Sequence, residues 1–268
     1  MIVSARTRTI ALLGDPVEHS LSPRMQNAGF RAAGIDAVYV ALRCDAEAVV
    51  PTMHLLAGAG GGGNVTIPHK MVAATGAPAV CADLGTGAIN TFVGSEKGLI
   101  VANTDVDAVT ASVATMGNPK GAWLILGTGG SARSAVAAAL AGGRAVAVSS
   151  REPSRAADFA RWCTAMGGYV VPATEAVVVI NATPLGLADG DTLPCNPEAW
   201  PNVRAALDLT YRARGTTAWC TAWRERGVEA LDGREPLLWQ GVAAWQYWFP
   251  DCVPPVQVMR AALANDVP

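Results

Sequence analysis

The sequence predicts an α/β protein of two domains, each built around a mainly parallel β-sheet. Short apolar runs alternate with helix-like stretches along the whole chain, which is typical of parallel sheets. The segment "LILGTGGSA" places a glycine-rich turn between an apolar run and an alanine-rich helical stretch, as in the first turn of a Rossmann-type unit. The segment "GNPKG" (117–121) breaks the chain near its middle, and 268 residues suffice for two ordinary domains.

Composition and charge exclude several classes of protein. With 51% hydrophobic and 16% charged residues, the chain can bury a sizeable core. The 20 Lys and Arg against 22 Asp and Glu are dispersed, so we expect no nucleic-acid partner. No apolar run approaches the roughly 20 residues that cross a bilayer, and the first residues reach Gly14-Asp15-Pro16 too soon for a signal peptide. We therefore expect a cytoplasmic protein without a membrane partner.

Cysteine and histidine spacing predicts neither a disulfide framework nor a structural metal. No two cysteines form a Cys-x-x-Cys pair, and the histidines lack zinc-motif spacing. We expect reduced, mostly buried thiols. The residues concerned are Cys44, Cys81, Cys163, Cys195, Cys220, Cys252, His19, His54 and His69.

The first elements alternate between strand and helix. "TIALLGD" (9–15) predicts a strand, and "SPRMQNAGFRAAG" a helix capped by Ser22 with Pro23 in its first turn. "AVYVAL" (37–42) predicts a second strand. A second helix is expected over 45–56, with Asp45 as its cap and Gly58 at its end.

The next segment carries polar side chains at strand ends. Glycines 60–63 lead into a short strand through Asn64 and Thr66, which Pro68 prevents from continuing. "GAINTFV" and "GLIVANTD" predict a hairpin-like pair that brings Asn90 and the segment 103–105 to a second strand end. Ligands of open α/β sheets lie at the carboxyl ends of strands. Hydroxyls, amides, one amine and one carboxylate suit a small ligand with several hydroxyls.

The second half follows the same alternation. We expect a helix over 105–116, strands at 122–126, 144–151, 176–183 and 205–210, and helices after "GTGGSA" and over 154–168. The tail 236–264 is expected to be helical with a break at "FPDCVPP", and its tryptophans to be core residues.

The glycine turn predicts a dinucleotide site. Gly127 permits the tight turn, Gly129 lets the backbone approach a pyrophosphate, and the following helix offers its free N–H groups. The next strand ends in "SSREPSR". An arginine there suits the 2′-phosphate of NADP, because a guanidinium binds two phosphate oxygens at once. Glu152, turned toward a ribose as in NAD sites, is the alternative.

These motifs together resemble those of the shikimate dehydrogenase family, which includes quinate-type enzymes. The likeness covers nearly the whole chain in order: "GDPVEHSLSP", "GNVTIPHK", "GAINT", "NTD", "GTGGSAR", "NATPLG", "DLTY" and "LLWQG". The resemblance implies a substrate domain and a doubly wound, Rossmann-like NADP domain flanking a cleft. It assigns 1–108 to substrate binding and catalysis, with helices from about 240–268 packing back on it, and 109–239 to the dinucleotide. It also implies reversible, NADP-dependent reduction of 3-dehydroshikimate to shikimate in aromatic amino-acid biosynthesis. We expect a monomer or a homodimer.

The resemblance assigns residues to roles. Lys70 and Asp105 match the catalytic pair. Reduction of a ketone needs a proton donor for the oxygen, so Lys70 fits that role, with Asp105 orienting it; His69 is the second candidate. The expected substrate ligands are Ser20, Ser22, Asn64, Thr66, Asn90, Tyr211 and Gln240. The expected cofactor-binding residues are Gly127, Gly129, Gly130, Ser131, Ala132, Ser150, Arg151, Arg155, Asn181 and Thr183.

Several residues depart from the family pattern, and they bear on substrate preference more than on fold. Oxidation of quinate or aminoshikimate is one alternative, and a non-catalytic sensor of NADP or ligand is another. A folate-type dehydrogenase lacks support from "HSLSP". The departures are Gln26, Val106, Asp107, Ala108, Ser150 and Ala213.

Overall fold

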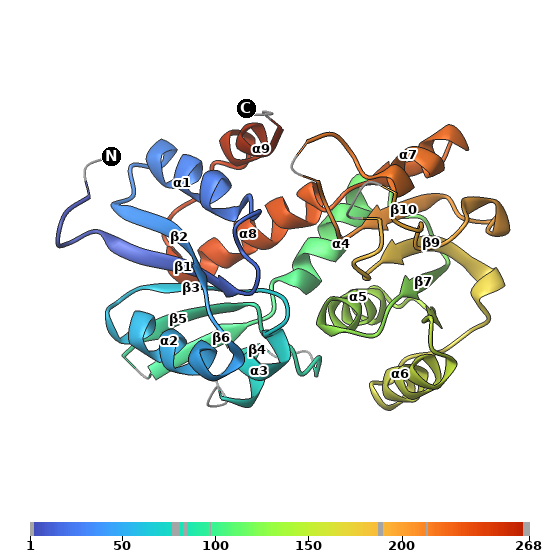
Figure 1. Cartoon of the computed structure of the whole chain (residues 1–268), viewed down its shortest axis with the longest axis horizontal. Helices are drawn as coiled ribbons and strands as arrows, with labels where there is room; N and C mark the ends of the chain where they lie inside the picture. Colours follow the sequence, from blue (N-terminus) through green and yellow to red (C-terminus); the bar gives the residue numbers. More distant parts are fainter. Residues whose placement is uncertain are drawn as a thin grey trace. The chain divides into compact units, whose positions relative to one another are not determined.

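The computed structural model describes residues 3–76, 81–82, 85–96, 98–186, 190–212 and 214–264. The chain divides into two compact units, one of residues 1–104 with 240–268 and the other of residues 105–239. Each is built around its own sheet (Figure 1). This confirms the predicted α/β class with two mainly parallel sheets.

The first unit has a six-stranded sheet in the order β2-β1-β3-β5-β6-β4. β1 pairs in parallel with β2 and β3, whereas β5 is antiparallel to both β3 and β6, so the predicted hairpin is confirmed. The strands are β1 (Arg8–Gly14), β2 (Ala37–Arg43), β3 (Gly62–Val65), β4 (Cys81–Ala82), β5 (Thr91–Ser95) and β6 (Gly98–Ala102).

Helices cover this sheet on the faces that its apolar side chains present. Val49 and Met53 of α2 and Ala73 of α3 pack with Leu13 and Phe92 in one core cluster. α9 packs against α1 (Figure 1). The helices of this unit are α1 (Ser22–Ala32), α2 (Ala46–Gly58), α3 (Lys70–Thr75), α9 (Val256–Ala264) and the part of α8 (Arg234–Trp248) that begins at Gln240.

The two predicted helix starts turned out differently. Asp45 caps α2 as predicted, because its side chain accepts a hydrogen bond of 2.9 Å from the Ala48 N–H. The prediction that Ser22 caps α1 is wrong: Ser22 is the first helical residue and Leu21 occupies the cap position. The Ser22 N–H instead donates to Ser20 Oγ, at 3.2 Å, so the serine two positions earlier satisfies that donor.

The glycine run before Asn64 has a steric cause. A Cβ on Gly63 would lie 2.7 Å from Cζ of Phe92 on the neighbouring strand β5. The aromatic ring therefore occupies the space that a side chain on β3 would need. Trp245 and Trp248 of α8 are buried in the same unit, which confirms their prediction as core residues.

The second unit has a five-stranded parallel sheet in the order β11-β10-β9-β7-β8. A single parallel bridge from Val146 to Val170 adds a further position outside β8. Counting this bridge, the strands follow the doubly wound order with its reversal between β7 and β9. The strands are β7 (Ala122–Leu126), β8 (Val146–Ser149), β9 (Ala176–Asn181), β10 (Ala205–Asp208) and β11 (Glu229–Leu231).

Both faces of this sheet are covered. Residues of α4, α5 and α6 share one core cluster with Ile125 and Ile180, whereas Trp219 and Trp223 of α7 pack with Leu124 on the other face. Neither α7 nor β11 was predicted from the sequence. The remaining elements are α4 (Asp105–Thr115), α5 (Gly130–Ala141), α6 (Pro153–Ala165), α7 (Ala218–Glu225) and the 3-10 turns η1 (Ala173–Glu175) and η2 (Pro197–Ala199).

Within the described residues, no helix is both long and apolar enough to cross a membrane. The cysteines whose side chains are described are free thiols; Cys163 and Cys220 are buried and Cys252 is exposed. The side chain of Cys81 lies outside the described residues.

Candidate functional site

Asn64, near the end of β3, forms hydrogen bonds to two hydroxyls and a backbone carbonyl. Its side-chain Nδ2 donates to the Asn90 carbonyl and to Thr91 Oγ1, both at 3.0 Å. Its Oδ1 accepts from the Tyr39 hydroxyl at 2.7 Å. Since a backbone carbonyl can only accept, these contacts fix which way the amide faces. Both N–H groups are engaged, so a ligand can meet Asn64 through the second lone pair of Oδ1.

Asn90 extends the same network. Its side-chain Oδ1 accepts from the Thr104 N–H at 2.8 Å, from Thr91 Oγ1 at 3.0 Å and from Thr104 Oγ1 at 3.2 Å. These donors fix which way the Asn90 amide faces, with Oδ1 toward the Thr104 N–H. The two asparagines are joined through the Asn90 carbonyl and the Thr91 hydroxyl.

Lys70 follows this strand end closely. It is the first residue of α3, and its carbonyl accepts from the Ile89 N–H at 2.9 Å, which ties the lysine backbone to the segment that carries Asn90. Thr66 lies between, with its N–H donating to the Leu13 carbonyl at 2.8 Å. Three of the predicted residues are therefore placed by one strand and its following turn.

His69, the alternative acid–base residue, has a different place. Its side chain is buried, and its Nε2 lies 2.9 Å from the Cys44 carbonyl. Since that oxygen can only accept, Nε2 carries the proton in this contact. The histidine links the turn after β3 to the end of β2, and this favours Lys70 over His69 as the group that meets a ligand.

The residues predicted to bind the substrate or to take part in catalysis are divided between the two units. Ser20, Ser22 and Gln240 belong to the first unit, as do Asn64, Thr66, Asn90 and Lys70. Asp105 is the first residue of α4, and Tyr211 follows β10; both belong to the second unit. The pairing of Lys70 with Asp105 stays a prediction.

The glycine turn after β7 has the geometry of an anion site. Gly127 has φ +110°, and a Cβ there would lie 2.9 Å from the Ala182 carbonyl. Gly129 is the cap residue of α5, and a Cβ on it would meet no atom within 4 Å. Ala132 is fully buried against the sheet. The turn therefore leaves open space at the N-terminus of a twelve-residue helix, where N–H groups and the helix dipole favour a phosphate.

The end of β8 lies beside this turn. The Gly127 N–H donates to the Ser149 carbonyl at 2.9 Å. Glu152 occupies the N-cap position of α6 without a side-chain capping bond, and its carboxylate accepts from Ser154 Oγ, in the first turn of that helix, at 2.9 Å. Arg151 and Arg155 are exposed. This arrangement favours an arginine contact to a phosphate over a carboxylate contact to a ribose.

A second polar network joins the ends of β9 and β10. Asn181 is fully buried; its Oδ1 accepts from the N–H and Oγ1 of Thr183, at 3.0 and 2.7 Å. Its Nδ2 donates to the Leu185 carbonyl at 3.2 Å and to Asp208 Oδ1 at 2.9 Å. The predicted cofactor contacts of Asn181 and Thr183 stay predictions; the bonds observed hold their own loop.

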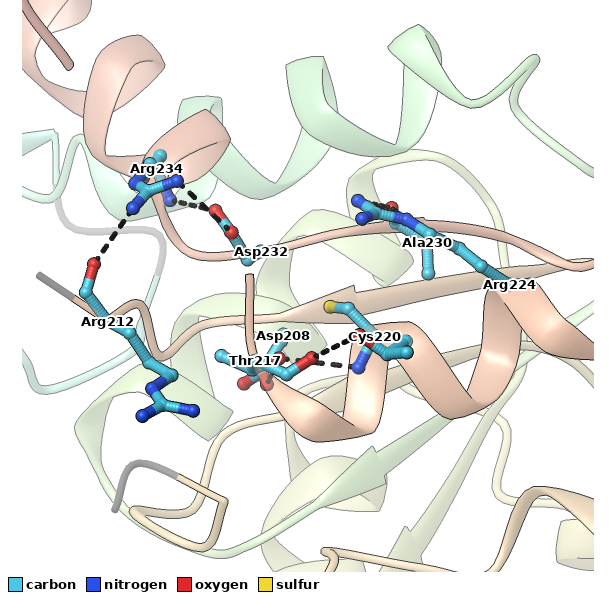
Figure 2. Close-up of polar contacts among 9 residues, drawn as sticks. Asp208, Arg212, Thr217, Cys220, Arg224, Ala230, Asp232 and Arg234 are labelled. Atoms are coloured by element: carbon cyan, nitrogen blue, oxygen red, sulfur yellow. Dashed lines mark hydrogen bonds and ion pairs between the residues drawn. The ribbon is translucent and has the colours of Figure 1, made fainter. Parts of the chain in front are cut away.

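Asp208 is the charged centre of this network, a role that was not predicted from the sequence. Its carboxylate is fully buried and accepts from the Thr210 N–H at 3.0 Å and from the hydroxyls of Thr210 and Thr217, each at 2.8 Å. Thr217 in turn caps α7 by accepting from the Cys220 N–H at 3.3 Å (Figure 2). Burial raises the pKa of Asp208, and these hydrogen bonds oppose the rise.

The loop that bears Tyr211 is also held from α8. Arg234 Nη2 donates to the Arg212 carbonyl at 3.1 Å, and the Arg234 N–H donates to Asp232 Oδ1 at 3.1 Å (Figure 2). The Gly233 N–H donates to the Thr210 carbonyl at 2.8 Å. The backbone on both sides of Tyr211 is therefore fixed by residues at the start of α8.

Three of the departures from the family pattern, Gln26, Val106 and Ala108, are buried, and Ala213 lies outside the described residues. Val106 and Ala108 are buried in α4, and Val106 packs in the cluster that contains Ala132, whereas Asp107 is exposed.

Among the described residues there is no group of three or more His, Cys, Asp or Glu side chains that could hold a metal ion.

Comparison with known proteins shows the family to which the chain belongs. The family model described as the shikimate dehydrogenase substrate binding domain matches residues 12–92, and the shikimate 5'-dehydrogenase C-terminal domain matches 233–264. The NADP(+) shikimate dehydrogenase of Rubrobacter xylanophilus is 36% identical over 98% of both chains. The chain belongs to the shikimate dehydrogenase family.

Solved structures support the same relation across both units. The shikimate 5-dehydrogenase of Thermus thermophilus, in complex with NADP(H) and shikimate, has a TM-score of 0.85 and 32% identity, covering 95% of this chain and 98% of that one. The 5-ketofructose reductase of a Gluconobacter strain shares the fold with a TM-score of 0.83 at 23% identity, covering 97% and 99% of the two chains. A likeness as distant as the latter concerns fold alone.

Proposed function

We propose that this chain catalyses the NADP-dependent, reversible reduction of 3-dehydroshikimate to shikimate; two of its relatives are named shikimate dehydrogenase (NADP(+)). It is an oxidoreductase acting on a CH–OH group. The observation that carries the proposal is the strand end of β3, where Asn64, Thr66 and Lys70 lie within seven residues. Hydrogen bonds join this segment to Asn90 and Ile89.

The first unit binds the polyhydroxylated ring in this proposal. Asn64 accepts from one ring hydroxyl through Oδ1, and Asn90, Thr66 and Gln240 complete the set. Ser20 and Ser22 bind the substrate carboxylate. Because Asn64 bonds to hydroxyls and a backbone carbonyl, a neutral ring hydroxyl can join them without burying an uncompensated charge.

Lys70 performs the proton transfer. As the ketone is reduced, its oxygen gains negative charge, and the Lys70 ammonium donates the proton that completes the hydroxyl. In the reverse direction the neutral amine removes that proton. Asp105 orients the lysine in this proposal, and Tyr211 contacts the substrate carboxylate. The carbonyl of Lys70 is fixed by Ile89, which limits the positions that the side chain can reach.

The second unit holds the cofactor. Gly127, Gly129, Gly130 and Ser131 present the turn and helix end for the pyrophosphate, and Arg151 and Arg155 bind the 2′-phosphate. The open space at Gly129 fits this assignment. NADPH, when bound, supplies the hydride. Ser150, Asn181 and Thr183 line the adjacent strand ends. A cytoplasmic location and a monomeric or homodimeric state stay predictions from the sequence.

The test is turnover by the purified full chain, followed as loss of NADPH absorbance. 3-Dehydroshikimate, 3-dehydroquinate and the amino analogue are each supplied with NADPH and with NADH. We expect rapid turnover confined to NADPH with 3-dehydroshikimate. Preference for either other ketone would replace the substrate assignment, and NADPH binding without any turnover would support a sensor.

The cofactor assignment has a separate test. Arg151→Ala should weaken NADP binding about 10- to 100-fold, the range for a lost charge-assisted hydrogen bond, and should leave NAD binding unchanged. Equal weakening of both would show that Arg151 does not contact the 2′-phosphate.

A further inference from the structure

Gln26 joins α1 to α8 through both ends of its side-chain amide. The side chain is fully buried. Its Nε2 donates to the Gly241 carbonyl at 3.3 Å, and its Oε1 accepts from Trp245 Nε1 at 2.7 Å. Both partners lie on α8, one turn apart. The indole N–H can only donate and the carbonyl can only accept, so the contact requires a group with one donor and one acceptor.

The two helices also approach each other closely at this point. A Cβ on Gly241 would lie 2.4 Å from Met25 Cε and 2.7 Å from Gln26 Nε2. A Cβ on Gly29, further along α1, would lie 2.9 Å from Cζ2 of Trp245. Glycine on each helix thus permits the contact. The hydrogen bonds of Gln26 then fix how α8 lies along α1, because Gly241 has no side chain that could do so.

Each of the two helices carries, close to this contact, a residue that is proposed to bind the substrate. Ser22 precedes Gln26 by one helical turn on α1, so the two residues share a face of that helix. Gln240 immediately precedes Gly241 on α8 and is 9% exposed. One buried amide therefore joins the helix that carries a carboxylate ligand to the helix that carries a ring-hydroxyl ligand.

We propose that Gln26 is a positioning residue that sets the distance between Ser22 and Gln240. Ser22 binds the substrate carboxylate and Gln240 a ring hydroxyl, so this distance determines how well the substrate fits. This inference rests on the proposed function. Gln26 touches neither substrate nor cofactor in this account; it acts through Gly241 and Trp245. Loss of the amide leaves a buried carbonyl and a buried indole N–H without this partner, and α8 can then shift along α1.

The experiment compares Gln26→Leu with Asn27→Ala in the full-length protein. Asn27, the next residue on α1, makes two bonds of similar kind to the backbone of Tyr39, at 2.8 and 2.9 Å, and none of these involves α8. We expect Gln26→Leu to raise the KM for shikimate about tenfold, with the KM for NADP+ and the protein's fold unchanged, because small misplacement of a ligand weakens binding and orientation. Asn27→Ala should lose comparable stability and keep its shikimate KM within about twofold.

A milder variant keeps the inference testable if Gln26→Leu does not fold. Trp245→Phe removes one of the two bonds and should raise the shikimate KM by less than Gln26→Leu. If a folded Gln26→Leu protein kept the wild-type KM, or if Asn27→Ala raised it equally, the inference would be overturned. Direct calorimetric titration of shikimate separates this result from the proposed function, because failure of the wild-type protein to bind shikimate would overturn the function itself.

Discussion

The two sheets end in polar networks that look alike in sequence and differ in charge. Near the end of β3, the side chain of Asn64 bonds to two neutral hydroxyls and a backbone carbonyl, and Lys70 begins the helix that follows. At the ends of β9 and β10, the network is built on the buried carboxylate of Asp208.

This difference indicates what each network can do. A neutral amide can exchange partners or admit a ligand hydroxyl at small cost, whereas a buried carboxylate needs its donors in place. We therefore interpret the first network as part of a ligand site. The second holds the loops that carry Thr183 and Tyr211 and the start of α7.

The largest effect on stability should follow removal of the carboxylate. Asp208→Ala leaves several buried donors unsatisfied and should lower the free energy of unfolding by about 3 kcal/mol or more. Asp208→Asn keeps the oxygen that accepts from Asn181 and Thr210, and its new N–H₂ can donate to the Thr217 hydroxyl. It should cost about 1 kcal/mol or less. Denaturant unfolding at neutral pH measures both.

The pH dependence of the free energy of unfolding provides a control for the two Asp208 variants. Because the pKa of Asp208 is raised in the native protein, the native carboxyl holds its proton to higher pH than the unfolded one. Its contribution to stability is therefore present in acid and is lost as pH rises through the raised pKa. Asp208→Asn should abolish this component. If Asp208→Ala were as stable as Asp208→Asn, the carboxylate would not organise the loops.

The next largest effect distinguishes Asn64 of the first network from Asn181 of the second. Asn64→Ala should raise the KM for shikimate about tenfold or more, since it removes a ligand and loosens the bonds to Tyr39 and Thr91. Asn181→Ala should lower stability by about 1–2 kcal/mol and leave the shikimate KM unchanged. Steady-state kinetics with both variants checks the contrast. An Asn181 variant with the larger shikimate defect would reverse the roles of the two networks.

A smaller effect on stability is expected at alkaline pH from three thiols of the second unit. Burial raises the pKa of Cys163 and Cys195 to about 11 and that of Cys220 to about 12, and all three belong to the second unit. Between the ordinary thiol pKa of 9.0 and these values, the unfolded chain has lost protons that the native protein retains. Stability should fall as pH rises, by up to about 1 kcal/mol per pH unit for each fully buried thiol.

A matched pair of variants checks this effect. Cys220→Ala should reduce the alkaline loss of stability, and Cys252→Ser, at an exposed position, should leave it unchanged. Equal slopes in all three proteins would show that the buried thiol does not contribute.

Much of the architecture follows from local sequence signals. The strand–turn–helix around Gly127, the capping of α2 by Asp45 and the β5–β6 hairpin each depend on neighbouring residues, so the sequence predicts them. Helix α7 and strand β11 are short, and their apolar residues are explained by packing on the far face of the sheet. That packing involves residues distant in the chain, so no local pattern predicts the two elements.

The site shows the same limit. Strand-end asparagines could be identified from the sequence, but the direction of each amide depends on partners such as Tyr39 and Thr104, 25 and 14 residues away. Asp208 was identified as part of a motif, and its burial became evident with the fold. The contact from Gln26 to Trp245 spans 219 residues, and no local pattern predicts it.

The most direct test of the account is the turnover of Lys70→Met, measured beside its calorimetric affinity for shikimate. Loss of a general acid should lower kcat about 10²- to 10⁴-fold, while shikimate still binds within about tenfold of wild type. His69→Gln, one residue earlier, should lose stability and retain most of its kcat, since His69 contacts the Cys44 carbonyl. A Lys70→Met protein with near-normal kcat, or a His69→Gln protein with the larger loss, would contradict the assignment of Lys70 as the proton donor.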